Sequence, residues 1–138
     1  MKFLIDCPPS YGRQNRRFKY KHRLSDQYKL YKDACAEAVA GCEAPEGPLM
    51  AFVTCYWDPK HVGDVDACVK ATLDGFTQGG LWADDSQVVC LVATQAHAPK
   101  DRYPHVEATV VAAEVVLGVD KFTDMLLEAQ DLWKERNR

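Results

Sequence analysis

The stretch LMAFVTCYW, residues 49–57, is the longest strongly apolar run in the chain. It is too short to cross a membrane as a helix, which takes roughly 20 apolar residues. Its length and its β-branched and aromatic members instead predict a largely buried strand. Asp58-Pro59 follows at once and ends this strand, because proline cannot donate a ladder hydrogen bond.

The segments on both sides of this strand alternate between helix and strand patterns. We predict helices from Ser25 to Gly41, from about Val65 to Gln78, and from Val119 to about Arg136. Their core-facing residues at helical spacing are Tyr28, Tyr31, Cys35, Ala38 and Val39 in the first, Val65, Val69, Thr72, Leu73 and Phe76 in the second, and Phe122, Met125, Leu126, Ala129 and Trp133 in the third. Further strands are predicted over residues 2–6, 86–96 and 105–113, with a hairpin-like connection over residues 99–104. This order is typical of an α+β fold with a small mixed sheet, two packed helices and a C-terminal helix. The length fits one domain, 1–138, in which 119–138 is a helical extension.

The composition excludes several classes of protein. Hydrophobic residues make up 47% of the chain, which is too many for a disordered segment. The N-terminal sequence MKFLIDCPPS has too short an apolar segment for a secretory signal, so we expect a cytoplasmic protein without membrane contact. Six cysteines occur without a CxxC pair, and several, Cys90 among them, lie in apolar patterns. We expect reduced, mostly buried thiols and no zinc site.

Charge is distributed unevenly along the chain. Residues 1–34 hold nine basic and three acidic side chains, a net charge of +6, whereas the remainder carries −9 of the total of −3. The acidic total argues against general adhesion to nucleic acid, but the basic segment allows a local contact with a polyanion. A solvated basic loop explains the same pattern.

Four aspartates and one lysine form the strongest candidate for chemistry. Asp64 and Asp66 lie at the predicted start of the second helix, and Lys70 shares a helix face with Asp66. Asp84 and Asp85 precede the next strand, so packing of the helix on that strand would return them beside the first pair. Two unit charges ~5 Å apart at an effective dielectric constant of ~20 repel by about 3 kcal/mol. Mg²⁺, or Mn²⁺ in its place, would relieve this repulsion, activate a water and stabilise charge on a phosphoryl centre.

Each of these residues also has an ordinary explanation. Asp64 can be a plain helix N-cap, Asp66 and Lys70 a simple helix pair, and Asp84 and Asp85 a solvated turn. From spacing alone, these explanations are favoured over a metal site.

The other polar residues are given no catalytic role. Asp74 is expected to be a surface partner of Lys70 or Gln78. The four histidines are scattered, and no two of them stand at metal-ligand spacing. No Gly-rich phosphate loop is visible, so we expect no nucleotide cofactor.

Taken together, the motifs resemble those of the RusA-type Holliday junction resolvases, which are small, homodimeric, metal-dependent endonucleases. The family pattern is Asp-x-Asp-Asn-x-x-Lys, a short helix ending in small residues, an aromatic residue, then Asp-Asp and an apolar strand. The matching residues are Asp64-Val65-Asp66-Ala67-Cys68-Val69-Lys70, Gly79-Gly80-Leu81-Trp82 and Asp84-Asp85-Ser86-Gln87-Val88-Val89. Pro8-Pro9-Ser10, Asn15-Arg16, Arg23-Leu24-Ser25 and Tyr31 also match, so the similarity covers roughly residues 3–112.

The resemblance overturns the ordinary explanations for most of the acidic motif. It implies that Asp64, Asp66 and Asp85 bind Mg²⁺, with Asp84 adjacent and supportive. It implies that Lys70 acts in catalysis or contacts the phosphate. It also implies a homodimer that presents two such sites to a four-way DNA junction, for paired nicks. The phosphate contacts are assigned to Arg13, Arg16, Arg17, Lys19, Lys21 and Arg23.

Three features depart from the family pattern. Ala67 stands in place of the Asn after the second Asp, which loosens the site if that amide orients a carboxylate or water. Residues 58–63 lack the basic run that some members carry, which leaves more of the DNA contact to residues 13–32. The helix after Val119 lies outside the pattern; its apolar stripe either covers the fold, as we expect, or adds to a dimer contact.

The leading function is therefore a Mg²⁺-dependent endonuclease that resolves Holliday junctions. One alternative is a branched-DNA-binding module that has lost cleavage, which Ala67 would allow. Another is a metal-dependent nuclease for other branched or flapped DNA.

Overall fold

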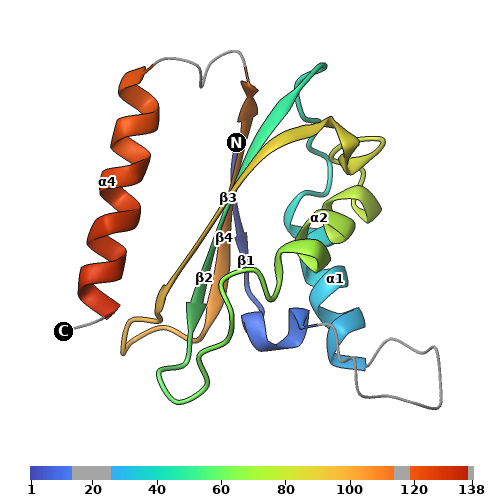
Figure 1. Cartoon of the computed structure of the whole chain (residues 1–138). Coiled ribbons are helices and arrows are strands. Elements are labelled where there is room, and N and C mark those ends of the chain that lie inside the picture. Colours follow the sequence, from blue (N-terminus) through green and yellow to red (C-terminus); the bar gives the residue numbers. More distant parts are fainter. Residues whose placement is uncertain (14–25, 114–118, 137–138) are drawn as a thin grey trace.

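Four strands form one mixed sheet in the computed structural model, which describes residues 1–13, 26–113 and 119–136 (Figure 1). The elements along the chain are β1 (Lys2–Ile5), η1 (Pro9–Gly12), α1 (Asp26–Ala38), β2 (Leu49–Trp57), α2 (Val69–Gln78), η2 (Asp85–Gln87), β3 (Val88–His97), β4 (His105–Ala112) and α4 (Val119–Arg136). The strand order across the sheet is β1-β4-β2-β3. β2 and β3 are parallel, and the other two pairings are antiparallel. The predicted α+β class with a small mixed sheet is confirmed.

The strand β2 lies inside the sheet, and its predicted bounds are confirmed. Ala51, Val53, Cys55 and Trp57 alternate along it, and each is at most 1% exposed. Alternate residues of a strand share one face, and these four belong to the core that α1 and α2 complete.

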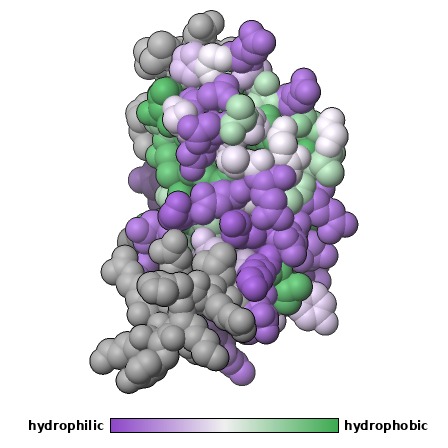
Figure 2. Space-filling view, turned by 90° about the vertical axis from the view of Figure 1, so that its right-hand side faces the viewer, coloured by the Kyte–Doolittle hydropathy of each residue, from purple (hydrophilic) through white to green (hydrophobic). Residues whose placement is uncertain are grey.

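The helices α1 and α2 pack against each other over one face of the sheet (Figure 1). Tyr31 and Cys35 of α1 and Phe76 of α2 are fully buried, as their helical spacing predicts. Gly75 lets the two helices approach closely, because a Cβ at this position would lie 2.9 Å from the carbonyl oxygen of Lys32. The outward side of this layer is largely hydrophilic (Figure 2).

The C-terminal helix α4 lies on the opposite side of the sheet, alongside β3 (Figure 1). Its predicted bounds are confirmed. Its contact with β3 of the same chain supports the expectation that it covers the fold. The side chains of all five residues in its predicted apolar stripe lie outside the described part of the chain.

Three predictions about local structure are wrong. The connection between β3 and β4 is not a hairpin of neighbouring strands, because β2 lies between them in the sheet. The helix α2 begins at Val69, and residues 65–68 form turns, so Val65 is 40% exposed instead of lying on the core face. Cys90 is exposed near the start of β3, an edge strand of the sheet, where the face it points to is left uncovered.

The thiols otherwise agree with the sequence. All six cysteines are free, and Cys7, Cys35, Cys55 and Cys68 are buried. Burial raises the pKa of Cys7 to about 11 and that of Cys35 to about 12, so both stay protonated at neutral pH. No helix within the described ranges is both long and apolar enough to cross a membrane.

Candidate active site

Asp64 and Asp66 lie in a turn that leads into α2. Both side chains are exposed, and their carbonyl oxygens accept hydrogen bonds from the N–H groups of Ala67 (3.1 Å) and Val69 (3.2 Å). These bonds join residues three apart, which keeps the segment out of the α-helical ladder until Cys68, the N-cap. The two carboxylates therefore meet solvent two residues apart, ahead of the helix.

The loop between β2 and this turn is held against the end of the strand. The carbonyl of Asp58 accepts a hydrogen bond from the N–H of His61 (2.9 Å), which closes a tight turn. Gly63 then approaches the indole of Trp57 so closely that a Cβ would lie 2.5 Å from Cη2. This approach places Asp64 near the end of β2 at which the chain leaves the sheet.

Lys70 lies in the first turn of α2, and its side chain is exposed. Its Nζ is 3.4 Å from the carboxylate of Asp74, one helical turn later. The expected pairing of Asp74 with Lys70 is confirmed, whereas Gln78 donates to Asp33 (2.8 Å). An exposed helix pair of this kind contributes about 0.3–0.5 kcal/mol. Little energy therefore holds the Lys70 side chain in this pair.

Asp84 and Asp85 lie where the chain enters β3. Asp84 is exposed, and a hydrogen bond from the Ser86 side chain is the main cause that lowers the pKa of its carboxyl. The carbonyl of Asp84 accepts a hydrogen bond from the N–H of Gln87 (3.3 Å). Asp85 is half-buried and is the first residue of η2. Asp84 is thus ionised at neutral pH and open to solvent.

The segment before Asp84 is fixed to the C-terminal end of α2. The N–H of Leu81 donates to the carbonyl of Phe76 (3.0 Å), and Nε1 of Trp82 donates to Oγ1 of Thr77 (2.7 Å). Leu81 and Trp82 are both buried. A helix of ten residues is about 15 Å long, so these anchors hold Asp84 away from the turn that precedes the helix.

The parallel pairing of β2 with β3 explains this separation. The two strands start together and end together, with Trp57 opposite His97. Asp85 precedes the start of β3, whereas Asp64 follows the loop that leaves the end of β2. The helical crossover between the parallel strands therefore carries the two acidic motifs to different parts of the fold.

The described residues contain no group of three or more acidic, histidine or cysteine side chains that could hold a metal ion. Asp64, Asp66 and Asp85 therefore do not form the expected three-carboxylate group within one chain. Mg²⁺ is often held by only one or two carboxylates, with water and substrate phosphates as the remaining ligands. The exposed pair of Asp64 and Asp66 fits that smaller donor set.

Of the six basic residues assigned to DNA, Arg13 alone lies in the part of the chain that the structure describes. It follows η1, and its guanidinium lies over the Trp57 ring, 4.8 Å from the ring centroid. Its Nη2 also donates a long hydrogen bond, 3.5 Å, to the carbonyl of His61. The sequence does not predict this contact, because Trp57 is too distant from Arg13 in the chain for local spacing to connect them. The residues outside the described ranges are Arg16, Arg17, Lys19, Lys21 and Arg23.

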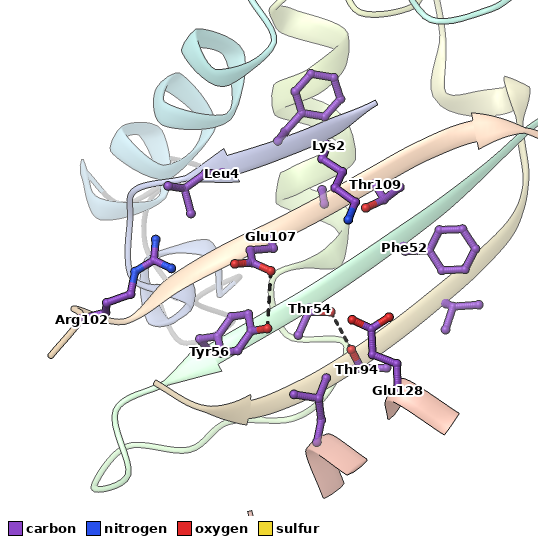
Figure 3. Close-up of a pocket in the computed structure, with 14 residues that line it drawn as sticks. Lys2, Leu4, Phe52, Thr54, Tyr56, Thr94, Arg102, Glu107, Thr109 and Glu128 are labelled. Atoms are coloured by element: carbon purple, nitrogen blue, oxygen red, sulfur yellow. Dashed lines mark hydrogen bonds between the residues drawn. The ribbon is translucent and has the colours of Figure 1, made fainter. Parts of the chain in front are cut away.

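A cavity of about 570 Å³ lies on the sheet face beside α4 (Figure 3). The Tyr56 hydroxyl donates to Glu107 (3.4 Å), and the hydroxyls of Thr54 and Thr94 are 2.7 Å apart. Burial, followed by the charge of Glu107, raises the pKa of Tyr56 to about 12. The cavity lining includes none of the predicted site residues. The alternation of polar and apolar residues along β2 is the sequence signal for this second face.

Comparison with known proteins points to one family. The family model described as endodeoxyribonuclease RusA matches residues 8–111. A crossover junction endodeoxyribonuclease of Enterobacteria phage 82 is 31% identical over 88 residues, which cover 62% of this chain and 73% of that protein. The crossover junction endodeoxyribonuclease RusA of Escherichia coli K12 is 29% identical and that of Shigella sonnei 28% identical, with the same coverage. The chain therefore belongs to the RusA family of endodeoxyribonucleases.

Proposed function

We propose that this chain is a divalent-metal-dependent endodeoxyribonuclease that cuts branched DNA, with the four-way junction as its preferred substrate. The observation that carries the proposal is the RusA family match over residues 8–111, which spans both acidic motifs and Lys70. The similar proteins of phage 82 and Escherichia coli are named crossover junction endodeoxyribonucleases. The exposed carboxylates of Asp64 and Asp66, just ahead of the exposed Lys70, support metal-dependent cleavage of a phosphodiester.

The turn before α2 supplies the groups for this chemistry. Asp64 and Asp66 would hold the metal together with water and a phosphate of the DNA backbone. Bound Mg²⁺ would lower the pKa of a water and stabilise charge on the phosphoryl group. Lys70 would leave its weak ion pair with Asp74 and neutralise the scissile phosphate.

A homodimer would bring together the acidic motifs that one chain holds apart. β3 is an edge strand, and its Val89 and Leu91 are 64% and 41% exposed. An exposed apolar edge is suited to pairing with a second copy. Antiparallel pairing of two β3 edges would set the start of one strand beside the end of the other. Asp85 of a second copy would then approach the end of the sheet that leads to Asp64.

The basic segment would position the DNA through its phosphates. The contacts assigned to Arg16, Arg17, Lys19, Lys21 and Arg23 carry no sequence information. Each such contact releases counterions, so junction binding should weaken steeply as salt rises. Binding that barely changes between low and physiological salt would contradict this role.

Cleavage of synthetic DNA tests the proposal. Labelled four-way junctions, three-way junctions, flaps and linear duplexes are incubated with Mg²⁺ or with EDTA. We expect paired nicks in the four-way junction, little cutting of the linear duplex, and none in EDTA. Preferential cutting of flaps would contradict the junction preference, and an absence of cutting on every substrate would contradict the nuclease activity.

A second candidate, a branched-DNA-binding protein without cleavage, is favoured by Ala67. This residue is partly buried against the core, and its methyl group cannot replace an amide that orients a carboxylate or water. Such a protein would bind the four-way junction in EDTA and leave it intact with Mg²⁺ or Mn²⁺. Cutting that appears only in the Ala67→Asn variant would support this candidate over the first.

A further inference from the structure

Arg13 is bound to the loop that precedes the acidic turn. Its guanidinium lies over the Trp57 ring at 4.8 Å from the centroid, and its Nη2 donates to the carbonyl of His61 at 3.5 Å. We propose that Arg13 is a positioning residue, which clamps the loop between Trp57 and Asp64 and so fixes the acidic turn. The inference rests on the proposed function, and it replaces the phosphate contact that the sequence suggests for this residue.

Gly63 is the second half of this clamp. It packs so closely that a Cβ would collide with Nη2 of Arg13 and lie 2.5 Å from Cη2 and 2.9 Å from Cζ2 of Trp57. The absence of a side chain at position 63 therefore creates the space in which the guanidinium meets the loop. Asp64 is the next residue, so a shift of Gly63 moves the first predicted metal ligand directly.

Trp57 gives the clamp a fixed base. It is the last residue of β2 and is 1% exposed. Its Nε1 is buried without a hydrogen-bond partner among the described residues. Among these residues, no hydrogen bond from the indole nitrogen holds the ring, so packing and the guanidinium over its face hold it.

A planar guanidinium suits this task better than an ammonium. It can stack on an indole with one face while an edge donates to a carbonyl, whereas a lysine ammonium is a point charge without a stacking plane. Arg13→Lys therefore keeps the charge and breaks the clamp. Positioning and phosphate binding predict opposite results for this variant.

The test compares Arg13→Lys, Arg13→Ala and Gly63→Ala with the wild type, and Arg102→Ala serves as the matched control. Arg102 is an exposed arginine in the connection between β3 and β4. Cleavage of a four-way junction with Mg²⁺ gives kcat and KM, and binding in EDTA at several salt concentrations gives the salt slope. Amide hydrogen exchange of residues 58–68 reports the loop without any need for activity.

A clamp predicts one signature for all three test variants. The kcat falls by about ten-fold or more, because a small misplacement near the chemistry is costly. KM and the salt slope stay within error of the wild type, and amide exchange at His61 and Ala67 accelerates. Gly63→Ala shows the same signature although it removes no charge. The control Arg102→Ala keeps the wild-type kcat and exchange rates.

Other results overturn the inference. If Arg13→Ala weakens binding and lowers the salt slope by about one while Arg13→Lys restores both, the residue is a phosphate ligand. Wild-type behaviour of Gly63→Ala, or unchanged exchange in the Arg13 variants, also contradicts the clamp. If the wild type cuts no DNA, the proposed function fails, and the exchange measurement still decides whether Arg13 holds the loop.

Discussion

A buried chain of hydrogen bonds ties α1 to the start of α2, and counting its donors predicts how it responds to mutation. Oγ1 of Thr72 donates to the carbonyl of Cys68 (2.8 Å), which uses its one proton. The 2.7 Å bond between Thr72 and Tyr31 must then be donated by the Tyr31 hydroxyl. Tyr31 and Thr72 are both 0% exposed, and Cys68 follows the acidic turn directly. This network therefore holds the helix end on which the candidate site depends.

The two single substitutions should differ in cost. Thr72→Val leaves the Tyr31 hydroxyl without its oxygen acceptor, which costs about 1–3 kcal/mol, and also loses a bond with a net value of about 1 kcal/mol. Tyr31→Phe leaves Thr72 bonded to Cys68, so its cost is about 1 kcal/mol. The thiols of Cys35 and Cys68 also contact the Tyr31 hydroxyl. As weak acceptors, they keep the cost of Thr72→Val toward the lower end of its range.

The double variant gives the sharpest test of this reasoning. Tyr31→Phe combined with Thr72→Val removes the donor and the acceptor together and orphans neither, so it should be more stable than Thr72→Val alone. Urea unfolding of the four proteins, with equal m-values, measures the free energies of unfolding. Additive losses, with the double variant the least stable of the four, would refute the assignment of the Tyr31 proton.

Three further results are expected. Burial raises the pKa of Cys7 to about 11 and that of Cys35 to about 12, against 9.0 for the unperturbed thiol, so their contribution to stability is complete below pH 9 and is lost as pH rises toward 12. The free energy of unfolding from urea curves should therefore fall over that range, and a rise would contradict the burial argument. Cys90 should react with a water-soluble maleimide in the native protein, whereas the four buried cysteines should react only after unfolding. Rapid labelling of Cys35 in the native protein would contradict this protection and show that the α1–α2 interface opens. Lys70→Ala should lower the turnover of junction cleavage more than it weakens junction binding, and normal turnover with weak binding would assign Lys70 to binding alone. Because the ion pair of Lys70 is exposed, the same substitution should change the free energy of unfolding by less than about 0.5 kcal/mol.

Local patterns predicted the elements well where each residue's environment follows from its neighbours. The apolar run of β2 ends at Asp58-Pro59, and the structure ends the strand at Trp57. The core face of α1 follows from the spacing of Tyr28, Tyr31 and Cys35. The predicted start of α2 is too early, because successive turns from Asp64 to Val69 use the backbone groups that the first helical turn would need.

Properties that depend on pairing between distant segments could not be read from the sequence. The apolar residues of β3 resemble those of a buried strand, yet Val89 and Leu91 are exposed near the start of this edge strand, where a register shift leaves Val89 without a partner in β2. The short connection to β4 suggested a hairpin, but β2 inserts between the two strands. Pattern alone does not specify strand order.

The same limit applies to the candidate site. The motif indicates the residue types and the resemblance implies their roles. The prediction that Asp85 lies beside Asp64 assumed that the helix between them returns the chain to the end of the sheet near Asp64. A helix that links two parallel strands carries the chain to the other end of the sheet instead. The contact of Arg13 with Trp57 could not be predicted for a related reason: the two residues are far apart in the chain, so no local spacing pattern connects them.

Cleavage of a four-way junction by Asp66→Asn, compared with Asp101→Asn, tests the account most directly. Both variants remove one carboxylate charge from an exposed side chain, but only Asp66 lies in the turn before α2. The account predicts that Asp66→Asn binds the junction in EDTA as the wild type does and no longer cuts it with Mg²⁺, while Asp101→Asn cuts normally. Cutting by Asp66→Asn at close to the wild-type rate would contradict the assignment of this turn as the catalytic centre.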